Sequence, residues 1–187
     1  MEFQHELVIP DEGLPFKFFL FEGSQGNYVR EKHWHTSIEI FAVMEGSLTF
    51  YLNDEKHPLK AGELMIINSN EVHSIDSPEE NHTAVLQIPL KQFEDYFTAH
   101  RFIRFAANEQ ETDSQLWRLI REMYKLYGKR GTGYEFKIRS FYYDVLYLLV
   151  NHYRLDEAGS APQPPSGCAC KNYFLYERAL SGRTQTD

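Results

Sequence analysis

The sequence predicts a mainly β fold, a barrel or sandwich of short strands, followed by a hairpin of two α-helices. Residues 28–88 alternate short apolar segments with turn-forming residues, which is typical of all-β barrels and sandwiches. After Pro89 the apolar residues recur at helical spacing, and a glycine-rich stretch divides this part in two. These observations predict a β half and then a helical half.

The β half begins with an irregular arm over residues 1–15, which contains Pro10, Gly13 and Pro15. Residues 16–21 form an apolar run that suits a first core strand. Two later segments have the period of two that a strand requires. In these segments Leu48, Phe50 and Leu52 alternate with Ser47, Thr49 and Tyr51, and Ala84, Leu86 and Ile88 alternate with Thr83, Val85 and Gln87.

The helical half begins at Pro89, because proline is well placed at a first helical position. A first long helix from Ser114, a turn over residues 128–133 and a second helix predict an antiparallel pair. The apolar face of the second helix is wide, so it either meets another subunit or lies deeper in the monomer. The apolar residues are Leu116, Leu119, Ile120, Met123 and Tyr127, then Ile138, Phe141, Tyr142, Val145, Leu146, Leu149 and Tyr153.

Three segments follow from this pattern. We assign residues 1–88 to the β-barrel with its N-terminal arm, and residues 89–157 to the helical segment packed on the barrel. Residues 158–187 begin with a stretch of Ala, Gly, Ser, Pro and Gln, which is the composition of a linker. We expect this linker and tail to be disordered.

Four polar side chains mark the centre of the β half: His33, His35, Glu39 and His73. Side chains alternate across a strand, so His33 and His35 share one face and Glu39 keeps the same parity. Turns at residues 53–55 and 61–62 bring the next strands back, and His73 follows one or two hairpins later. We therefore expect the four side chains to converge in one pocket.

These residues resemble the cupin superfamily. Its first motif has the form G-(x)5-H-x-H-(x)3,4-E-(x)6-G, which Gly26, His33, His35, Glu39 and Gly46 follow with one extra residue between Gly26 and His33. The resemblance implies a cupin-type barrel, a double-stranded β-helix or jelly roll. It also implies that the two histidines and the glutamate line its interior.

The second cupin motif, G-(x)5-P-x-G-x-x-H-(x)3-N, is matched by Gly62 and His73. Asn68 and Asn70 replace its Pro and Gly, and Ser77 replaces its final Asn. The spacing is intact. These replacements make the conformation of the loop that leads to His73 less tightly specified.

A closer resemblance is to the ligand-sensing domain of AraC-type transcription regulators, over roughly residues 7–156. It rests on Glu39-Ile40 with Val43 and Gly46, on Gly62-Glu63-Leu64, and on residues 68–74, Asn-Ser-Asn-Glu-Val-His-Ser. The resemblance implies a sensor, not an enzyme, that binds a small, sugar-like polar metabolite and dimerises through its helical hairpin. DNA would be bound only by a C-terminal helix-turn-helix part of roughly another 100 residues, which this chain does not contain.

The chemistry of His33, His35, Glu39 and His73 leaves three interpretations open. Three imidazoles and a carboxylate suit Zn, Mn, Fe or Ni. In sensor domains of the resembling family the imidazoles often hydrogen-bond a small ligand without a metal. One or more of them could instead be core histidines with satisfied hydrogen bonds. We favour direct ligand contact, and the alternative is a stand-alone metal-dependent cupin enzyme, an isomerase or dioxygenase.

Charge and composition bear on partners and location. The net charge of −8 argues against direct binding to phosphates. No nucleophile motif of the G-x-S-x-G type and no phosphate-binding loop occurs in the sequence. The N-terminus lacks the basic and apolar regions of a signal peptide, and no apolar run is long enough to span a membrane. We therefore expect a cytoplasmic protein without membrane contact.

Overall fold

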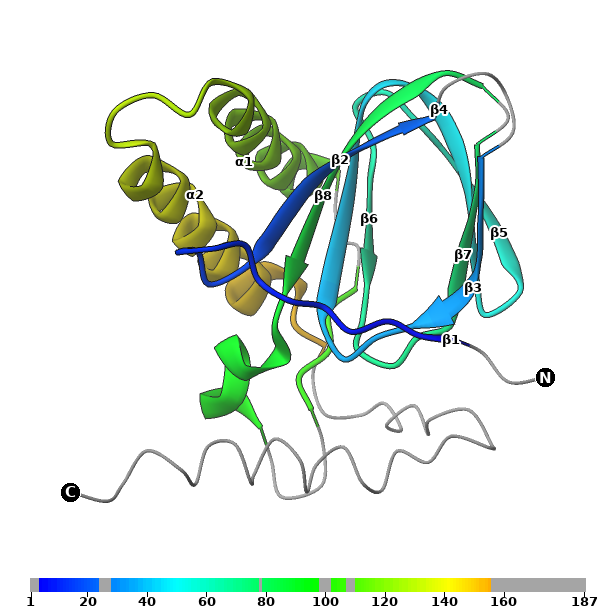
Figure 1. Cartoon of the computed structure of the whole chain (residues 1–187). Helices are drawn as coiled ribbons and strands as arrows, with labels where there is room; N and C mark the ends of the chain where they lie inside the picture. Colours follow the sequence, from blue (N-terminus) through cyan, green and yellow to red (C-terminus); the bar gives the residue numbers. More distant parts are fainter. Residues whose placement is uncertain (1–3, 24–27, 78, 98–101, 107–109, 156–187) are drawn as a thin grey trace.

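The computed structural model describes residues 4–23, 28–77, 79–97, 102–106 and 110–155. Its β half is a curled, barrel-like pair of sheets, and two helices lie against one side of it (Figure 1). The predicted linker and tail, residues 158–187, lie outside the described part. The strands are β1 (Gln4–His5), β2 (Lys17–Gly23), β3 (Tyr28–Trp34), β4 (Ile38–Leu52), β5 (Glu55–Lys60), β6 (Leu64–Ile67), β7 (His73–Ser77) and β8 (Asn81–Ile88).

The long strand β4 belongs to both sheets. Its first part pairs antiparallel with β8 and β6, and β8 pairs in turn with β2. Its second part pairs with β5 and β7, and β7 pairs with β3. The short strand β1 pairs parallel with β3 at the end of this second sheet. Because β4 passes from one sheet to the other, the two sheets enclose a common interior.

The passage of β4 between the sheets occurs at Gly46. The register of β4 against β8 shifts between Val43 and Glu45, and Gly46 follows with a φ of 74°. A Cβ atom at Gly46 would lie 2.0 Å from the carbonyl oxygen of Glu80. Only glycine has both the required backbone freedom and the required space at this bend.

Alternate residues of the shared sheet face two different apolar clusters. In β4 and β8, Ile40 and Leu86 point to the helices, whereas Phe41 and Val85 point into the barrel. Residues 81 and 83–88 of β8 are all buried, so the predicted polar positions Thr83 and Gln87 are covered as well. The alternation of side chains is confirmed. The exposure that alternation often implies is absent, because the helices cover the face of Leu86, whereas Thr83 and Gln87 face the barrel interior with Val85.

The helical half comprises a 3₁₀ segment η1 (Leu90–Tyr96), helix α1 (Gln110–Lys129), helix α2 (Tyr134–Leu148) and a π-helical turn η2 (Leu149–Tyr153). The expected helix from Pro89 is a kinked 3₁₀ segment, because Phe93 leaves helical geometry. Helix α1 begins before Ser114 and extends through Lys129, so the predicted turn is shorter than expected. The apolar stripe of α1 is confirmed, with Leu116, Ile120 and Met123 fully buried.

The described helices are also informative about membranes. Neither α1 nor α2 has a stretch that is both long and apolar enough to cross a bilayer. Their apolar residues pack against the outer face of β2, β4 and β8 instead, in one cluster with Phe16, Phe18 and Ile38.

Candidate functional site

Four strands place polar side chains on the inner face of the barrel. Glu39 on β4 lies directly opposite Gln87 on β8, and His73 on β7 lies directly opposite His33 on β3. Inward-facing Phe41 and Val43 follow Glu39 along β4 and belong to the barrel's apolar cluster. The polar groups therefore lie at one end of the interior, next to its apolar cluster.

His35 reaches the same place by a different route from the one that strand parity predicted. It lies beyond the end of β3, in the bend before β4, so His35 and Glu39 do not share a strand. The prediction that strand parity places His35 and Glu39 on one face was wrong. The bend brings the His35 ring back over β4, and a hydrogen bond from the His35 Nδ1–H to the Ser37 carbonyl, at 3.0 Å, holds the ring there.

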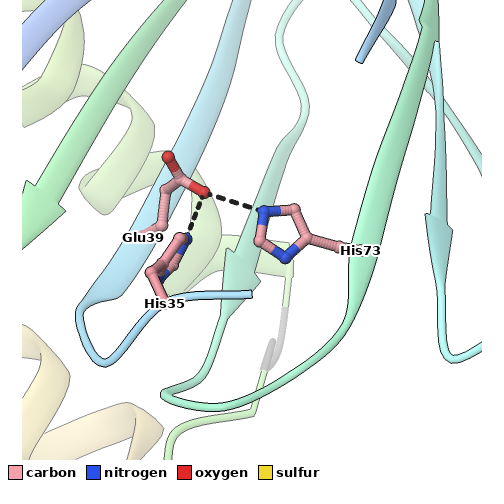
Figure 2. A group of neighbouring side chains, drawn as sticks. All are labelled: His35, Glu39 and His73. Atoms are coloured by element: carbon pink, nitrogen blue, oxygen red, sulfur yellow. Dashed lines mark hydrogen bonds and ion pairs between the residues drawn. The ribbon is translucent and has the colours of Figure 1, made fainter. Parts of the chain in front are cut away.

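His35, Glu39 and His73 form a compact buried group, drawn in Figure 2. His35 Nε2 lies 2.9 Å from Glu39 Oε2, and His73 Nε2 lies 3.2 Å from the same oxygen. One potential ligand atom from each residue lies within 4.8 Å of the other two. Both histidine side chains are fully buried, and that of Glu39 is 2% exposed.

The tautomers of the histidines follow from their backbone contacts. The Nδ1 atoms of His33, His35 and His73 lie 2.8, 3.0 and 3.0 Å from the carbonyl oxygens of Glu31, Ser37 and Glu71. A carbonyl oxygen only accepts hydrogen bonds, so each Nδ1 carries the proton. Each Nε2 then has a lone pair free for a proton, a ligand donor or a metal ion.

The charge states of His35 and Glu39 follow from opposing effects. Burial favours the neutral forms, but the attraction between His35 and Glu39 outweighs it. The pKa of His35 is raised, and that of Glu39 is held well below its usual range by His35 and by the contact with His73. His35 therefore keeps a second proton to higher pH than a free imidazole, and donates it in the hydrogen bond from Nε2 to the Glu39 carboxylate.

His33 lies beside the compact group rather than within it. Its ring centroid is 4.2 Å from that of His73, but its Nε2 faces Glu6, with the Glu6 Oε2 atom 3.4 Å away. Burial lowers the pKa of His33 to about 4, and the nearby positive charge of Arg30 adds to this effect. Of the four predicted residues, the structure brings three into one cluster and leaves His33 adjacent to it.

Two residues at the site were missed by the sequence interpretation. Gln87 donates from Nε2 to Glu39 Oε1 at 2.7 Å, while its own Oε1 is buried without a hydrogen-bond partner among the described residues. Glu6 accepts a hydrogen bond from Arg30 at 2.7 Å and lies next to His33. The strand register could have identified Gln87, because it pairs with Glu39. No sequence pattern places Glu6, which depends on parallel pairing of a two-residue strand.

The donor set fits a divalent metal ion. The Nε2 atom of His73 is buried and makes no hydrogen bond among the described residues. Nδ1–H groups bound to backbone carbonyls also orient the imidazoles of many metal sites. His35 Nε2, His73 Nε2 and a Glu39 oxygen would hold such an ion, and two nitrogens with one carboxylate suit Zn, Mn, Fe or Ni.

The barrel of two sheets sharing one long strand, with imidazoles and a carboxylate at one end, defines a cupin-type fold. The profile of the AraC-like ligand binding domain matches residues 15–146. The chain belongs to this family.

Solved structures with similar folds include three bacterial proteins. A cupin-2 domain containing protein from Shewanella frigidimarina is 29% identical, with a TM-score of 0.35 over 38% of this chain and 69% of that one. The EutQ protein of Clostridium difficile is 18% identical, with a TM-score of 0.34 over 38% and 55%. A variant of Bacillus subtilis oxalate decarboxylase is 22% identical, with a TM-score of 0.35 over 38% and 20%.

The matched regions thus include little more than half of the EutQ protein and one fifth of the decarboxylase. A comparison with curated protein sequences found no match.

Proposed function

We propose that this chain is the effector-sensing domain of an AraC-type transcription regulator. A small polar metabolite of the sugar type binds inside the barrel at His35, Glu39 and His73, with His33 beside them. The observation that carries the proposal is a buried polar cluster in which Gln87 Oε1 has no hydrogen-bond partner among the described residues, and His73 Nε2 has only the contact with Glu39 Oε2 at 3.2 Å. Membership of a ligand-binding family supports the same assignment.

The chemistry of the cluster suits a ligand rich in hydroxyl groups. Unpaired buried acceptors are costly, and each would be satisfied by one donor of the ligand. The Glu39 carboxylate accepts as well, and hydroxyls both donate and accept, so a polyhydroxyl compound meets every group in turn. Each such hydrogen bond contributes roughly 1 to 3 kcal/mol of affinity when its loss leaves a buried group unpaired.

The second candidate function is that of a metal-dependent cupin enzyme. It is favoured by the specific grouping of His35, Glu39 and His73 within 4.8 Å. When bound, a metal would supply Lewis-acid or redox chemistry. The residues of the chain would hold the ion through two imidazole nitrogens and one carboxylate oxygen, with the backbone carbonyls of Ser37 and Glu71 fixing the rings.

Metal content separates these two functions. We expect protein purified without an affinity tag to contain less than about 0.1 equivalents of Zn, Mn, Fe and Ni by elemental mass spectrometry, because His35 and Glu39 already form an ion pair that a metal would have to displace. His57, which is on β5 and outside the cluster, provides the control His57→Ala. About one equivalent of metal, lost in His35→Ala together with catalytic turnover but kept in His57→Ala, would establish the enzyme instead.

The helical hairpin is the surface we assign to dimerisation. Three aromatic side chains, Phe136, Tyr143 and Tyr147, form a stripe at i, i+7 and i+11 on α2 and are 70%, 58% and 65% exposed. Beside Tyr147 an open groove runs between α1 and α2, lined by Leu119, Leu148 and charged residues of both helices. Exposed aromatic residues beside a groove are typical of an interface between protein chains.

We therefore expect a homodimer at micromolar concentration in sedimentation velocity. The double substitution Tyr143→Asp and Tyr147→Asp should give a monomer, because two buried charges at the interface would be unpaired. Tyr96→Asp, at a 46% exposed tyrosine of η1 away from the stripe, is the matched control and should stay dimeric. A monomeric wild-type protein under these conditions would remove the assignment.

DNA contact is assigned to a part of the regulator outside these 187 residues. The net charge of −8 makes the chain itself a poor ligand for phosphates. A sensor that controls transcription would act in the cytoplasm, with the hairpin transmitting the state of the barrel to the DNA-binding part.

A further inference from the structure

The loop before His73 contains the residues that depart from the cupin pattern, and it is tied to the site at both ends. The backbone N–H of Asn70 donates to the carbonyl oxygen of His35 at 2.8 Å. The carbonyl oxygen of Glu71 accepts the Nδ1–H of His73 at 3.0 Å. Movement of the His73 imidazole, or of the His35 backbone, would therefore displace the backbone of residues 70–71.

Asn68 connects this loop to the helical half. Its side-chain amide donates to the carbonyl oxygen of Phe105 at 2.9 Å, and its Oδ1 accepts from the N–H of Phe105 at 2.8 Å. One carboxamide thus pairs with both backbone groups of a residue 37 positions away. The proline that stands here in the general motif has no side chain able to make these bonds.

Glu71 makes a second connection from the same loop. Its Oε1 accepts a hydrogen bond from Arg104 Nη2 at 2.6 Å, and its Oε2 accepts from the backbone N–H of Asn68 at 2.8 Å. The Glu71 side chain is 7% exposed and that of Arg104 is 30% exposed, so the ion pair is largely shielded from water. A charge-assisted bond in this setting is stronger than a neutral one.

The segment held by Asn68 and Glu71 is joined in turn to the end of the helical hairpin. Ala106 N–H donates to the Tyr153 carbonyl at 2.9 Å, and Leu155 N–H donates to the Arg104 carbonyl at 2.9 Å. Phe105 and Arg154 form an antiparallel bridge just after the π-helical turn η2. A π-helical turn marks a place where a helix departs from regular geometry, often for a functional reason.

We propose that Asn68, Glu71 and Arg104 form a latch that couples the His35–His73 site to the chain leaving the helical hairpin. The latch consists of these three side chains and the backbone of residues 104–106. A ligand that moves His73 shifts the Glu71 carbonyl, and the latch passes the shift to residues 153–155. This inference rests on the proposed function, because the coupling has a role only if a ligand binds at the site. The contacts that form the latch are all between residues of the chain itself.

The latch accounts for the two asparagines of the second motif. Asn68 makes the connection, and Asn70 has a φ of 66° in the left-handed region, which asparagine tolerates better than most residues. The loop therefore replaces the rigid proline of the motif with a side chain that hydrogen-bonds to another part of the fold. The two ends of such a coupling influence each other equally.

The first test is hydrogen exchange by NMR on the full chain, with EDTA and no added ligand. The amides of Phe105, Ala106 and Leu155 report on the latch, because each donates one of the bonds described above. His73→Ala should speed their exchange at least about tenfold by removing the tie to Glu71, whereas His57→Ala should leave it unchanged. In a Glu71→Gln background the further effect of His73→Ala should fall below about twofold.

Unchanged exchange of the three amides in folded His73→Ala, or an undiminished tenfold effect in the Glu71→Gln background, would overturn the latch. Amides of the β4–β5 pairing show that a variant is folded. If His73→Ala does not fold, His73→Leu replaces it, because leucine fills the buried space and cannot donate to the Glu71 carbonyl.

A reciprocal test starts from the other end. Arg104→Gln should move the ¹⁵N resonances of the His73 imidazole, because the position of Glu71 fixes that ring. Arg118→Gln, at an exposed arginine of α1 whose Nε–H donates to the carbonyl oxygen of Ser114 on the same helix at 3.2 Å, should leave them in place. Identical His73 resonances in Arg104→Gln and the wild type would contradict the coupling. Both tests omit the effector, so the latch can fail while effector binding stands, and the reverse.

Discussion

Acidification from pH 6.5 to pH 4 should destabilise the fold by about 3 kcal/mol through His33 alone. Burial lowers the pKa of His33 to about 4 in the folded state, while the unfolded value is 6.5. Between these values the unfolded chain binds a proton that the folded chain does not, so stability is lost as the pH falls. Well above pH 6.5 both states are neutral at His33, and its contribution no longer changes.

The neighbouring ion pair shapes the rest of the profile. The raised pKa of His35 contributes stability that is fully present below about pH 6.5 and is lost as the pH rises through the folded value. The depressed pKa of Glu39 contributes stability that is present above about pH 4.5 and is lost as the pH falls through its folded value. These opposing slopes predict maximal stability near pH 6 to 6.5.

Urea denaturation at several pH values, with EDTA, measures this profile. His33→Gln should remove most of the loss between pH 6.5 and pH 4, because glutamine does not titrate. His57→Gln is the matched control, since the His57 side chain is 36% exposed and it should keep the wild-type slope. A His33→Gln profile parallel to that of the wild type would show that another group dominates the acid limb.

Glu39→Gln should cost about 3 to 5 kcal/mol of folding free energy near pH 6. The substitution keeps the shape of the side chain, including its contact with Gln87, but removes the charge that supports the buried His35 imidazolium. A buried cation without its partner must lose its proton or destabilise the fold. The cost should therefore shrink as the pH rises and His35 becomes neutral in both proteins.

The same denaturation experiment at pH 6 and pH 8.5 tests this expectation. Glu122→Gln removes one partner of an exposed ion pair with Lys125 and should cost less than about 1 kcal/mol at either pH. Equal costs for Glu39→Gln and Glu122→Gln, or a cost for Glu39→Gln that grows toward pH 8.5, would contradict the assigned charge states.

The fold could be predicted from the sequence because its signals are local and regular. Three signals depend only on residues that are close together in the sequence. These are the period of two in residues 47–52, the apolar stripe of the first long helix and the break at Pro89. The helix–barrel packing was also anticipated. The double burial of β8 was not anticipated, since the side chains of a strand alone do not show what covers each face.

The site could be predicted only in part. His35, Glu39 and His73 come together as the motif implied, but the bend at residues 35–37, not strand parity, brings His35 and Glu39 into contact. Gln87 and Glu6 complete the surroundings through strand pairings with residues distant in sequence. Such pairings depend on the global register, which local patterns leave undetermined.

The departures at Asn68 and Asn70 show a related limit. From the sequence they are imperfect matches to a motif, whereas in the structure Asn68 joins the loop to Phe105. A polar residue in place of a motif's Pro is informative only once its bonding partner is known. Asn68 and Phe105 are 37 positions apart, so the sequence does not show that they are partners.

The central claim is that the buried cluster of His35, Glu39 and His73 binds a polar effector directly. Its most direct test is the melting temperature of EDTA-treated protein across a panel of sugars and polyols, for the wild type and for His35→Ala. A ligand at about 100 times its dissociation constant should raise the wild-type melting temperature by roughly 5 to 10 °C. We expect such a rise in the wild type with at least one compound, and no rise in the melting temperature of His35→Ala. An equal rise in His35→Ala, or stabilisation by divalent metals alone, would contradict it.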